Sequence, residues 1–134
     1  MEKTLLIIKP DGVDRKLIGE IIKRVETDGF DILNIRWMLM NRNEAGEFYA
    51  VHKGKPFYND LVDYITSGPV VALLLQRENA QRRLREIVGA TDPKKAAGGT
   101  IRADFGSSIQ NNTVHASDPA EDPAREIKLV FGEG

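Results

Sequence analysis

Three stretches of the chain carry the hydrophobic patterns of β-strands. Residues 4–8 form a short apolar run that ends in Lys9-Pro10-Asp11-Gly12. This predicts a buried strand leading into a turn, because Pro cannot continue a strand ladder and Asp-Gly favours turns. Residues 70–75 form a second apolar run and predict another buried strand. Between them, residues 33–39 alternate at strand periodicity and predict a strand with one buried face. The residues of that face are Leu33, Ile35, Trp37 and Leu39.

Apolar residues at helical spacing mark two amphipathic helices. One covers residues 18–25, with Gly29 as its C-terminal stop. The other covers residues 80–88 and is closed by Gly89. Between these two helices, residues 43–66 predict helical pieces that are broken around Gly54-Lys55-Pro56.

The C-terminal third predicts shorter elements. Residues 92–99 form a loop rich in Gly and Lys, and residues 113–115 fit a short last strand. A helix should follow either Asp118 or Asp122. If Asp118 were the cap, Pro123 would fall inside the helix and cost about 3 kcal/mol. With Asp122 as the cap, Pro123 occupies the first helical position, so we favour Asp122, preceded by an irregular turn.

The predicted order is strand, helix, strand, helix, strand, helix, strand. Two βαβ-like halves on a small sheet indicate a ferredoxin-like α+β sandwich, with a small doubly wound α/β fold as the competing architecture. Pattern alone does not separate the two, because the apolar strands suit either. No repeat or linker divides the sequence, so we expect one domain over residues 1–134.

Composition narrows the function classes. The chain has 134 residues, of which 41% are hydrophobic and 29% charged, with a formal net charge of −1. This balance is that of an ordinary globular domain and gives no indication of a nucleic-acid or membrane partner. Cysteine is absent, which excludes disulfides and thiol nucleophiles. The N-terminal apolar run is too short for a signal peptide or a membrane span, so we expect a cytoplasmic protein.

Elimination leaves histidine as the main candidate for reactivity. The sequence contains no Walker-type phosphate loop, no serine nucleophile elbow and no histidine pair at metal-ligand spacing. His52 stands beside two lysines and fits a solvated surface histidine. His115 stands among small and polar residues at the predicted strand end, a context that favours function only modestly. The basic residues Lys9, Arg85 and Arg102 lie at element ends or on polar faces, where a fold could bring them together.

The segment Asn112-Thr113-Val114-His115-Ala116-Ser117-Asp118 resembles the active-site motif of the nucleoside diphosphate kinases. Further segments are similar to that family in the same order and spacing, over about residues 3–131. They are Ile8-Lys9-Pro10-Asp11-Gly12-Val13, Phe48-Tyr49-Ala50-Val51-His52-Lys53, Lys55-Pro56-Phe57, Ser67-Gly68-Pro69-Val70-Val71, Gly89-Ala90-Thr91-Asp92-Pro93 and Gly99-Thr100-Ile101-Arg102-Ala103-Asp104-Phe105.

The resemblance implies a role for each matching residue. His115 is the expected phosphate acceptor, and Lys9 and Asn112 are expected to bind the sugar hydroxyls, with Lys9 also near the transferred phosphate. Phe57 is expected to stack on the base, with Ile109 on its other face. The residues expected to hold the phosphates are Arg85, Thr91 and Arg102. Those expected near the transferred group or supporting the histidine are Tyr49, Ser117 and Glu126.

The resemblance also implies a reaction and its partners. The family fold is the ferredoxin-like sandwich with a four-stranded antiparallel sheet. We expect ping-pong transfer of the γ-phosphoryl group from a nucleoside triphosphate to a nucleoside diphosphate, ribo or deoxyribo. Mg²⁺ should arrive on the nucleotide phosphates, and the protein should form a homo-oligomer: a dimer, tetramer or hexamer. No membrane or nucleic acid is required. The alternative is a phosphohistidine carrier or regulatory module without nucleotide turnover.

Overall fold

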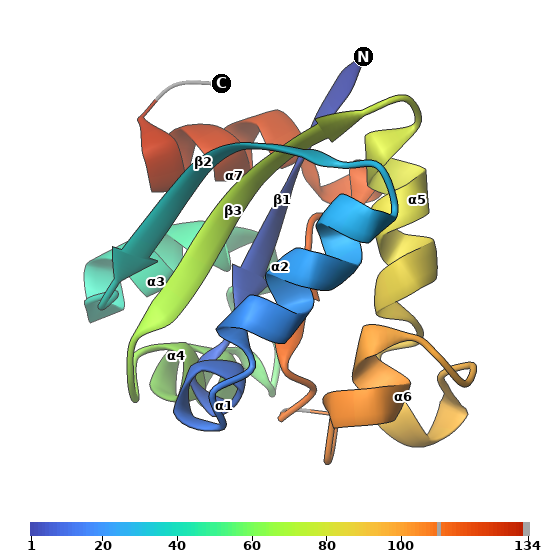
Figure 1. The fold of residues 1–134 in the computed structure, drawn as a ribbon. Helices are drawn as coiled ribbons and strands as arrows, with labels where there is room; N and C mark the ends of the chain where they lie inside the picture. The colour runs from blue at the N-terminus through green and yellow to red at the C-terminus, as the bar shows by residue number, and fades with distance from the viewer. Residues whose placement is uncertain (110, 133–134) are drawn as a thin grey trace.

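A four-stranded antiparallel sheet with strand order β2-β3-β1-β4 forms the centre of the structure (Figure 1). The computed structural model describes residues 1–109 and 111–132. The strands are β1 (Glu2–Ile8), β2 (Asp31–Met38), β3 (Val70–Arg77) and β4 (Val114–Ala116). Every neighbouring pair is antiparallel, which confirms the ferredoxin-like α+β fold and excludes the doubly wound alternative.

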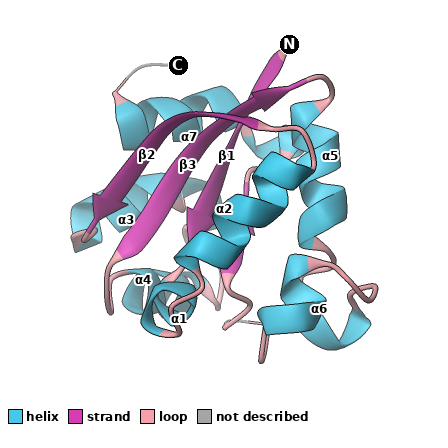
Figure 2. Ribbon diagram, in the orientation of Figure 1, coloured by secondary structure: helices cyan, strands magenta, loops and turns pink. Residues whose placement is uncertain are grey.

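Helices cover both faces of the sheet (Figure 2). In Figure 1, α2 crosses the front of the sheet, whereas α3, α4 and α7 lie behind it. The helices are α1 (Pro10–Asp14), α2 (Ile18–Thr27), α3 (Arg42–Phe48), α4 (Tyr58–Ile65), α5 (Ala80–Val88), α6 (Ile101–Phe105) and α7 (Pro123–Phe131). No helix among the described residues is long and apolar enough to cross a membrane.

The two central strands separate two hydrophobic cores. Leu5 and Ile7 of β1 face the core built with α3, α4 and α7. Leu6 and Ile8 face the opposite core, which contains Ile21 of α2 and other residues of α2 and α5. Both faces of β1 and β3 are therefore buried, as their continuous apolar runs predicted.

The prediction that one face of β2 is buried is wrong. Leu33, Ile35, Trp37 and Leu39 are all exposed, Trp37 by 64%. Ile35 and Trp37 pair with Leu73 and Val71, so they lie on the same sheet face as α2. However, β2 is an edge strand, and the core beneath α2 and α5 is built on β1 and β3. The exposed apolar side chains of β2 therefore lie beyond the core beneath α2 and α5.

The predicted helices 18–25 and 80–88 are confirmed as α2 and α5, and the broken stretch 43–66 as α3, a 3₁₀ turn and α4. The alternatives at the C-terminus are also decided. Asp122 is the N-cap of α7 and accepts a hydrogen bond from Arg125 N, with Pro123 at the start of the helix. Asp118 instead caps a 3₁₀ turn at Pro119–Glu121. The five-residue helices α1 and α6 were not predicted.

Candidate active site

A cleft of about 530 Å³ brings together side chains from distant parts of the sequence. Most residues that the resemblance singled out line this cleft: Lys9, Tyr49, Phe57, Arg85, Thr91, Arg102, Ile109, Asn112 and His115. The two others, Ser117 and Glu126, are buried and reach His115 through hydrogen-bond and electrostatic contacts.

His115 is the middle residue of β4 and pairs with Ile7 of β1. Strand alternation turns its flanking residues, Val114 and Ala116, into the core beneath α2 and α5. The imidazole therefore lies on the opposite face, where its ring meets Phe48 edge-on at a centroid distance of 5.0 Å. The short strand fixes which side of the sheet carries the histidine.

One ring nitrogen of His115 faces a carboxylate. Nε2 lies 3.4 Å from Oε1 of Glu126 on α7. The same oxygen accepts a 2.7 Å hydrogen bond from Oγ of Ser117. Both supporting residues are at most 3% exposed, so water does not compete strongly for these contacts. Glu126, held by Ser117, fixes the orientation of the ring. Nδ1 is then the ring nitrogen that does not face the carboxylate.

Lys9, Asn112 and Thr91 form a chain of contacts at the end of β1. Nζ of Lys9 donates to Oδ1 of Asn112 at 2.8 Å, and Nδ2 of Asn112 donates to the Thr91 carbonyl at 2.9 Å. Burial lowers the pKa of Lys9 to about 8, with a further lowering by Arg102 and an opposing effect of Asp11. The contact between Lys9 and Asn112 joins segments that are 103 positions apart in sequence.

Thr113, between Asn112 and the strand, has a left-handed backbone with φ of 78°. This conformation is unfavourable for a β-branched residue and needs support from its surroundings. Oδ2 of Asp11 accepts the Thr113 N–H at 3.1 Å, and the Thr113 carbonyl accepts the Lys9 N–H at 2.8 Å. The turn after β1 thus holds the backbone that presents Asn112 and His115.

Two arginines reach the cleft from α5 and α6. Nη1 of Arg85 donates to the Ala116 carbonyl at 3.1 Å. Arg102 donates to the carbonyls of Val114 at 2.9 Å and Gly89 at 3.2 Å. Burial, followed by the nearby positive charge of Arg85, lowers the pKa of Arg102 to about 10. The cleft therefore concentrates positive charge beside His115.

The remaining cleft residues are aromatic or apolar. Phe57 is 45% exposed at the start of α4, and Ile109 is 61% exposed on the C-terminal side of α6. Tyr49 is buried, and burial together with Glu126 raises its pKa. An open aromatic face beside a cationic cleft suits a flat ring attached to an anionic chain.

The expectation of a solvated surface position for His52 is wrong. His52 lines the same cleft and is partly buried. Its ring centroid lies 5.2 Å from that of Phe57 and 6.2 Å from that of Tyr49. The neighbouring lysines favoured a surface position, whereas the turn at Gly54 brings Phe57 back against the imidazole. Asp60, Leu61 and Asp118 also line the cleft without having been singled out.

Comparison with known sequences identifies one family over nearly the whole chain. The family model described as nucleoside diphosphate kinase matches residues 2–134. The nucleoside diphosphate kinase of a Nitratiruptor species is 53% identical over 133 residues, which cover 99% of this chain and 97% of that protein. The one from Anaeromyxobacter sp. (strain K) is 54% identical and covers 99% of this chain and 90% of that protein.

Solved structures give the same result. The nucleoside diphosphate kinase of Halobacterium salinarum, solved in complex with CDP, matches with a TM-score of 0.95 and 43% identity. That match covers 98% of this chain and 88% of the other. The Aquifex aeolicus enzyme matches with a TM-score of 0.94 and 42% identity, covering 97% of this chain and 94% of the other. Family model, sequence relatives and structures agree, and the chain belongs to the nucleoside diphosphate kinase family.

Proposed function

We propose that this protein transfers the γ-phosphoryl group of a nucleoside triphosphate to a nucleoside diphosphate through a phosphohistidine at His115. The observation that carries the proposal is the Glu126 carboxylate against Nε2 of His115, beside a cationic cleft. A carboxylate contact at one ring nitrogen orients the imidazole and raises the nucleophilicity of the other. Nδ1 is then the attacking atom.

In the first half-reaction, Nδ1 forms a bond to the γ-phosphorus, and the bond from that phosphorus to the β,γ-bridging oxygen breaks. The nucleoside diphosphate leaves with the electron pair. In the second half-reaction, a terminal oxygen of the acceptor diphosphate attacks the phosphohistidine, and the histidine nitrogen is the leaving group. One cleft serves both halves, so donor product must leave before acceptor binds.

Charge neutralisation is the main task of the other residues. Arg85 and Arg102 present planar groups that match phosphate oxygens, and Thr91 offers a hydroxyl. Lys9 adds a positive charge that is paired with Asn112. Mg²⁺ enters as part of the substrate, bound to the nucleotide phosphates, and balances their charge.

The base and sugar are bound with little discrimination. Phe57 and Ile109 flank the open end of the cleft, and stacking on an aromatic face contributes about 1–3 kcal/mol for any base. The sugar hydroxyls bind Lys9 and Asn112. Purine and pyrimidine nucleotides should therefore both be substrates, and deoxyribose should be accepted with some loss of affinity.

The exposed side of β2 supports assembly into a homo-oligomer. Ile35 and Trp37 on the edge strand β2, together with Leu39 directly after it, form an exposed apolar stripe. The outer backbone edge of β2 pairs with no other strand of the described sheet. A second copy of the chain supplies an identical stripe and an identical edge, so a two-fold contact covers both at once.

The test follows phosphate from γ-labelled ATP with Mg²⁺ onto the protein and then onto added GDP or CDP, with His115→Ala alongside. We expect acid-labile, base-stable label on the wild type only, which moves rapidly to either diphosphate. Label that forms but never leaves would instead support a phosphohistidine carrier. A folded wild type that takes no label would overturn the proposal.

A further inference from the structure

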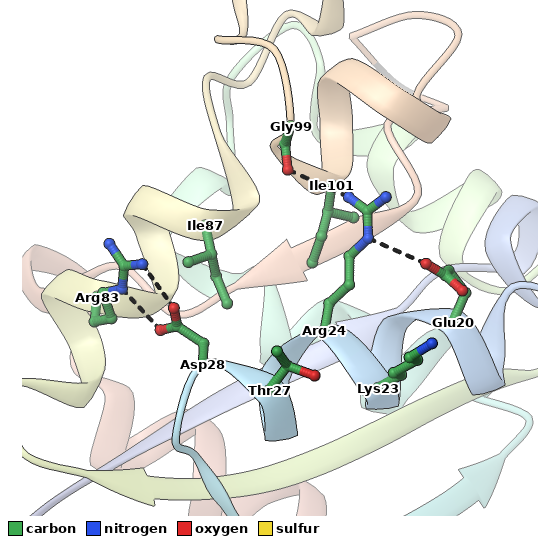
Figure 3. Close-up of a pocket in the computed structure, with 9 residues that line it drawn as sticks. All are labelled: Glu20, Lys23, Arg24, Thr27, Asp28, Arg83, Ile87, Gly99 and Ile101. Carbon is green, nitrogen blue, oxygen red and sulfur yellow. Dashed lines mark hydrogen bonds and ion pairs between the residues drawn. The ribbon is translucent and has the colours of Figure 1, made fainter.

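A second cavity, of about 410 Å³, lies between α2, α5 and the segment that begins α6 (Figure 3). Arg24, Asp28, Arg83 and Gly99 are among the residues that line it. Two of the dashed contacts in Figure 3 reach out from the α2 side: Asp28 accepts hydrogen bonds from Arg83 of α5, and Arg24 donates to the Gly99 carbonyl.

Arg24 of α2 makes three contacts to one short segment of chain. Nη2 lies 2.8 Å from Oδ2 of Asp104, and Nη1 donates to the Gly99 carbonyl at 3.3 Å. The guanidinium also stacks over the Phe105 ring, with its carbon 4.6 Å from the ring centroid. All three partners belong to residues 99–105, the segment that carries Arg102.

This segment has little helical stability of its own. With five residues, α6 is far shorter than an isolated helix needs, so its position depends on tertiary contacts. Ile101 anchors its first turn in the core. Its end is held from outside the cleft, by Arg24 and by Arg15, which donates to the Phe105 carbonyl. Arg102 therefore lies between the anchor at Ile101 and the contacts at Phe105.

We propose that Arg24 is a positioning residue for Arg102 and, through it, for the diphosphate of the nucleotide. The proposal rests on the proposed nucleotide site. Arg24 lines the second cavity and not the cleft, so it does not contact substrate. Without Arg24, the end of α6 loses its ion pair and its stacking partner together. The Arg102 guanidinium then samples a wider range of positions, and a site that needs fixed charges loses affinity.

A partly exposed ion pair with a structural role alone would predict a different result. The Arg24 and Asp104 side chains are 27% and 35% exposed, and such pairs contribute little to global stability. A purely structural role would therefore change neither nucleotide affinity nor its coupling to Arg102. Measurements of nucleotide affinity therefore distinguish a positioning role from a purely structural one. Thermal unfolding of each variant serves as the control for stability.

The experiment measures ADP binding by calorimetry for the wild type, Arg24→Gln, Arg102→Gln and the double variant. Arg82→Gln is the matched control, because Arg82 is an exposed arginine on α5 with a 4.0 Å pair to Glu86. We expect Arg24→Gln to weaken ADP binding about fivefold, within the usual range for residues that influence a binding site without contacting the ligand. In the Arg102→Gln background, Arg24→Gln should have no further effect. AMP, which lacks the β-phosphate, should bind all variants nearly alike.

Asp104→Asn removes the same ion pair from the other side and should reproduce the loss if Arg24→Gln folds poorly. Equal ADP affinities in Arg24→Gln, Asp104→Asn and Arg82→Gln would overturn the proposal. An equal loss in the presence and absence of Arg102 would also overturn it, because Arg24 would then act by another route. Binding is measured without turnover, so a wild type that binds ADP but transfers no phosphate contradicts the proposed function and not this inference.

Discussion

Nε2 of His115 lies 3.4 Å from Oε1 of Glu126, which the chain brings to it from α7. Ser117 donates to the same carboxylate oxygen, so one buried group receives both contacts. We predict that Glu126→Gln slows phosphohistidine formation about 10- to 100-fold, because a neutral amide supports the ring less well than a carboxylate. Rapid-quench measurement of label on the protein checks this.

Ser117→Ala should slow the same step by a smaller factor, because Glu126 keeps its contact to the ring. Ser67→Ala is the matched control, since the exposed Ser67 hydroxyl donates to the Tyr64 carbonyl at the end of α4. A Glu126→Gln protein that forms phosphohistidine at the wild-type rate would show that the carboxylate has no part in the reaction.

Because the pKa of Lys9 is lowered to about 8, we predict that the pH profile of activity falls on its alkaline side. Above that pH the amine loses its charge, and the cleft attracts the nucleotide phosphates less strongly. We expect kcat/KM to fall above about pH 8, because this ratio reports groups of the free enzyme. Lys9→Met should have a low kcat/KM without this alkaline fall, whereas Lys23→Met, on the exposed side of α2, should keep it.

The same group has the opposite effect on stability. The folded-state pKa of Lys9 lies below the ordinary value of 10.5, so between pH 8 and 10.5 the unfolded chain binds more protons. The contribution of Lys9 to the free energy of unfolding therefore rises with pH across this range. Urea unfolding of the wild type and Lys9→Met at about pH 7 and about pH 10 measures it; a difference that does not change with pH would contradict the assignment.

Asp28 predicts an acid-sensitive contact between α2 and α5. Hydrogen bonds from Arg83, with a further contribution from Arg77, hold the pKa of Asp28 below its ordinary value although burial opposes this. The stabilisation is therefore present above pH 3.8 and is lost as the pH falls through the folded-state value. Asp28→Asn should destabilise the fold by about 2 kcal/mol at about pH 7, and by less at about pH 3, where this carboxyl is mostly protonated in the unfolded chain.

Asp63→Asn is the control for this acid effect. Asp63 pairs with Arg42 at 2.6 Å, but the two side chains are 63% and 62% exposed. Its replacement should change the free energy of unfolding by less than about 1 kcal/mol. Chemical denaturation at the two pH values separates the variants, and equal losses would contradict the special position of Asp28.

The exposed stripe on β2 predicts the effect of one charge on assembly. Trp37→Glu should convert the proposed oligomer into smaller species, because it places a charge on the face proposed to pair with a second copy. Sedimentation velocity measures the change. Val51→Glu, which places the same charge on an exposed apolar residue outside the stripe, should leave the assembly intact. A wild type that is monomeric at all concentrations would contradict the proposed contact.

The sequence predicted the elements that are marked by a long apolar run or by several turns of helical periodicity. The runs of β1 and β3 and the periodicity of α2 and α5 were sufficient, and Pro123 correctly favoured Asp122 as a cap. The exposure of Trp37 was not predictable in this way, because it depends on β2 being an edge strand. Helices α1 and α6 were missed because five residues are too few to show a period.

Site prediction divided along similar lines. His115 could be singled out by elimination, but only the family motif gave it a role. Lys9, Arg85 and Arg102 each resembled an ordinary surface charge until the family resemblance gave them roles, and the fold brings all three to one cleft. His52 was misjudged from its lysine neighbours, since sequence proximity says nothing about the turn that returns Phe57 to its ring. Arg24 gave no signal at all, because the segment that it contacts lies far along the chain.

The three-residue length of β4 has an evolutionary consequence. His115 faces the cleft only because it sits opposite Ile7, with Val114 and Ala116 turned into the other core. A one-residue insertion that shifted the strand by one position would exchange the faces, burying the imidazole and pointing valine at the substrate. Insertions and deletions next to His115 are therefore restricted to those that keep the strand in register. Lineages that vary in this segment must keep that register or lose the nucleophile.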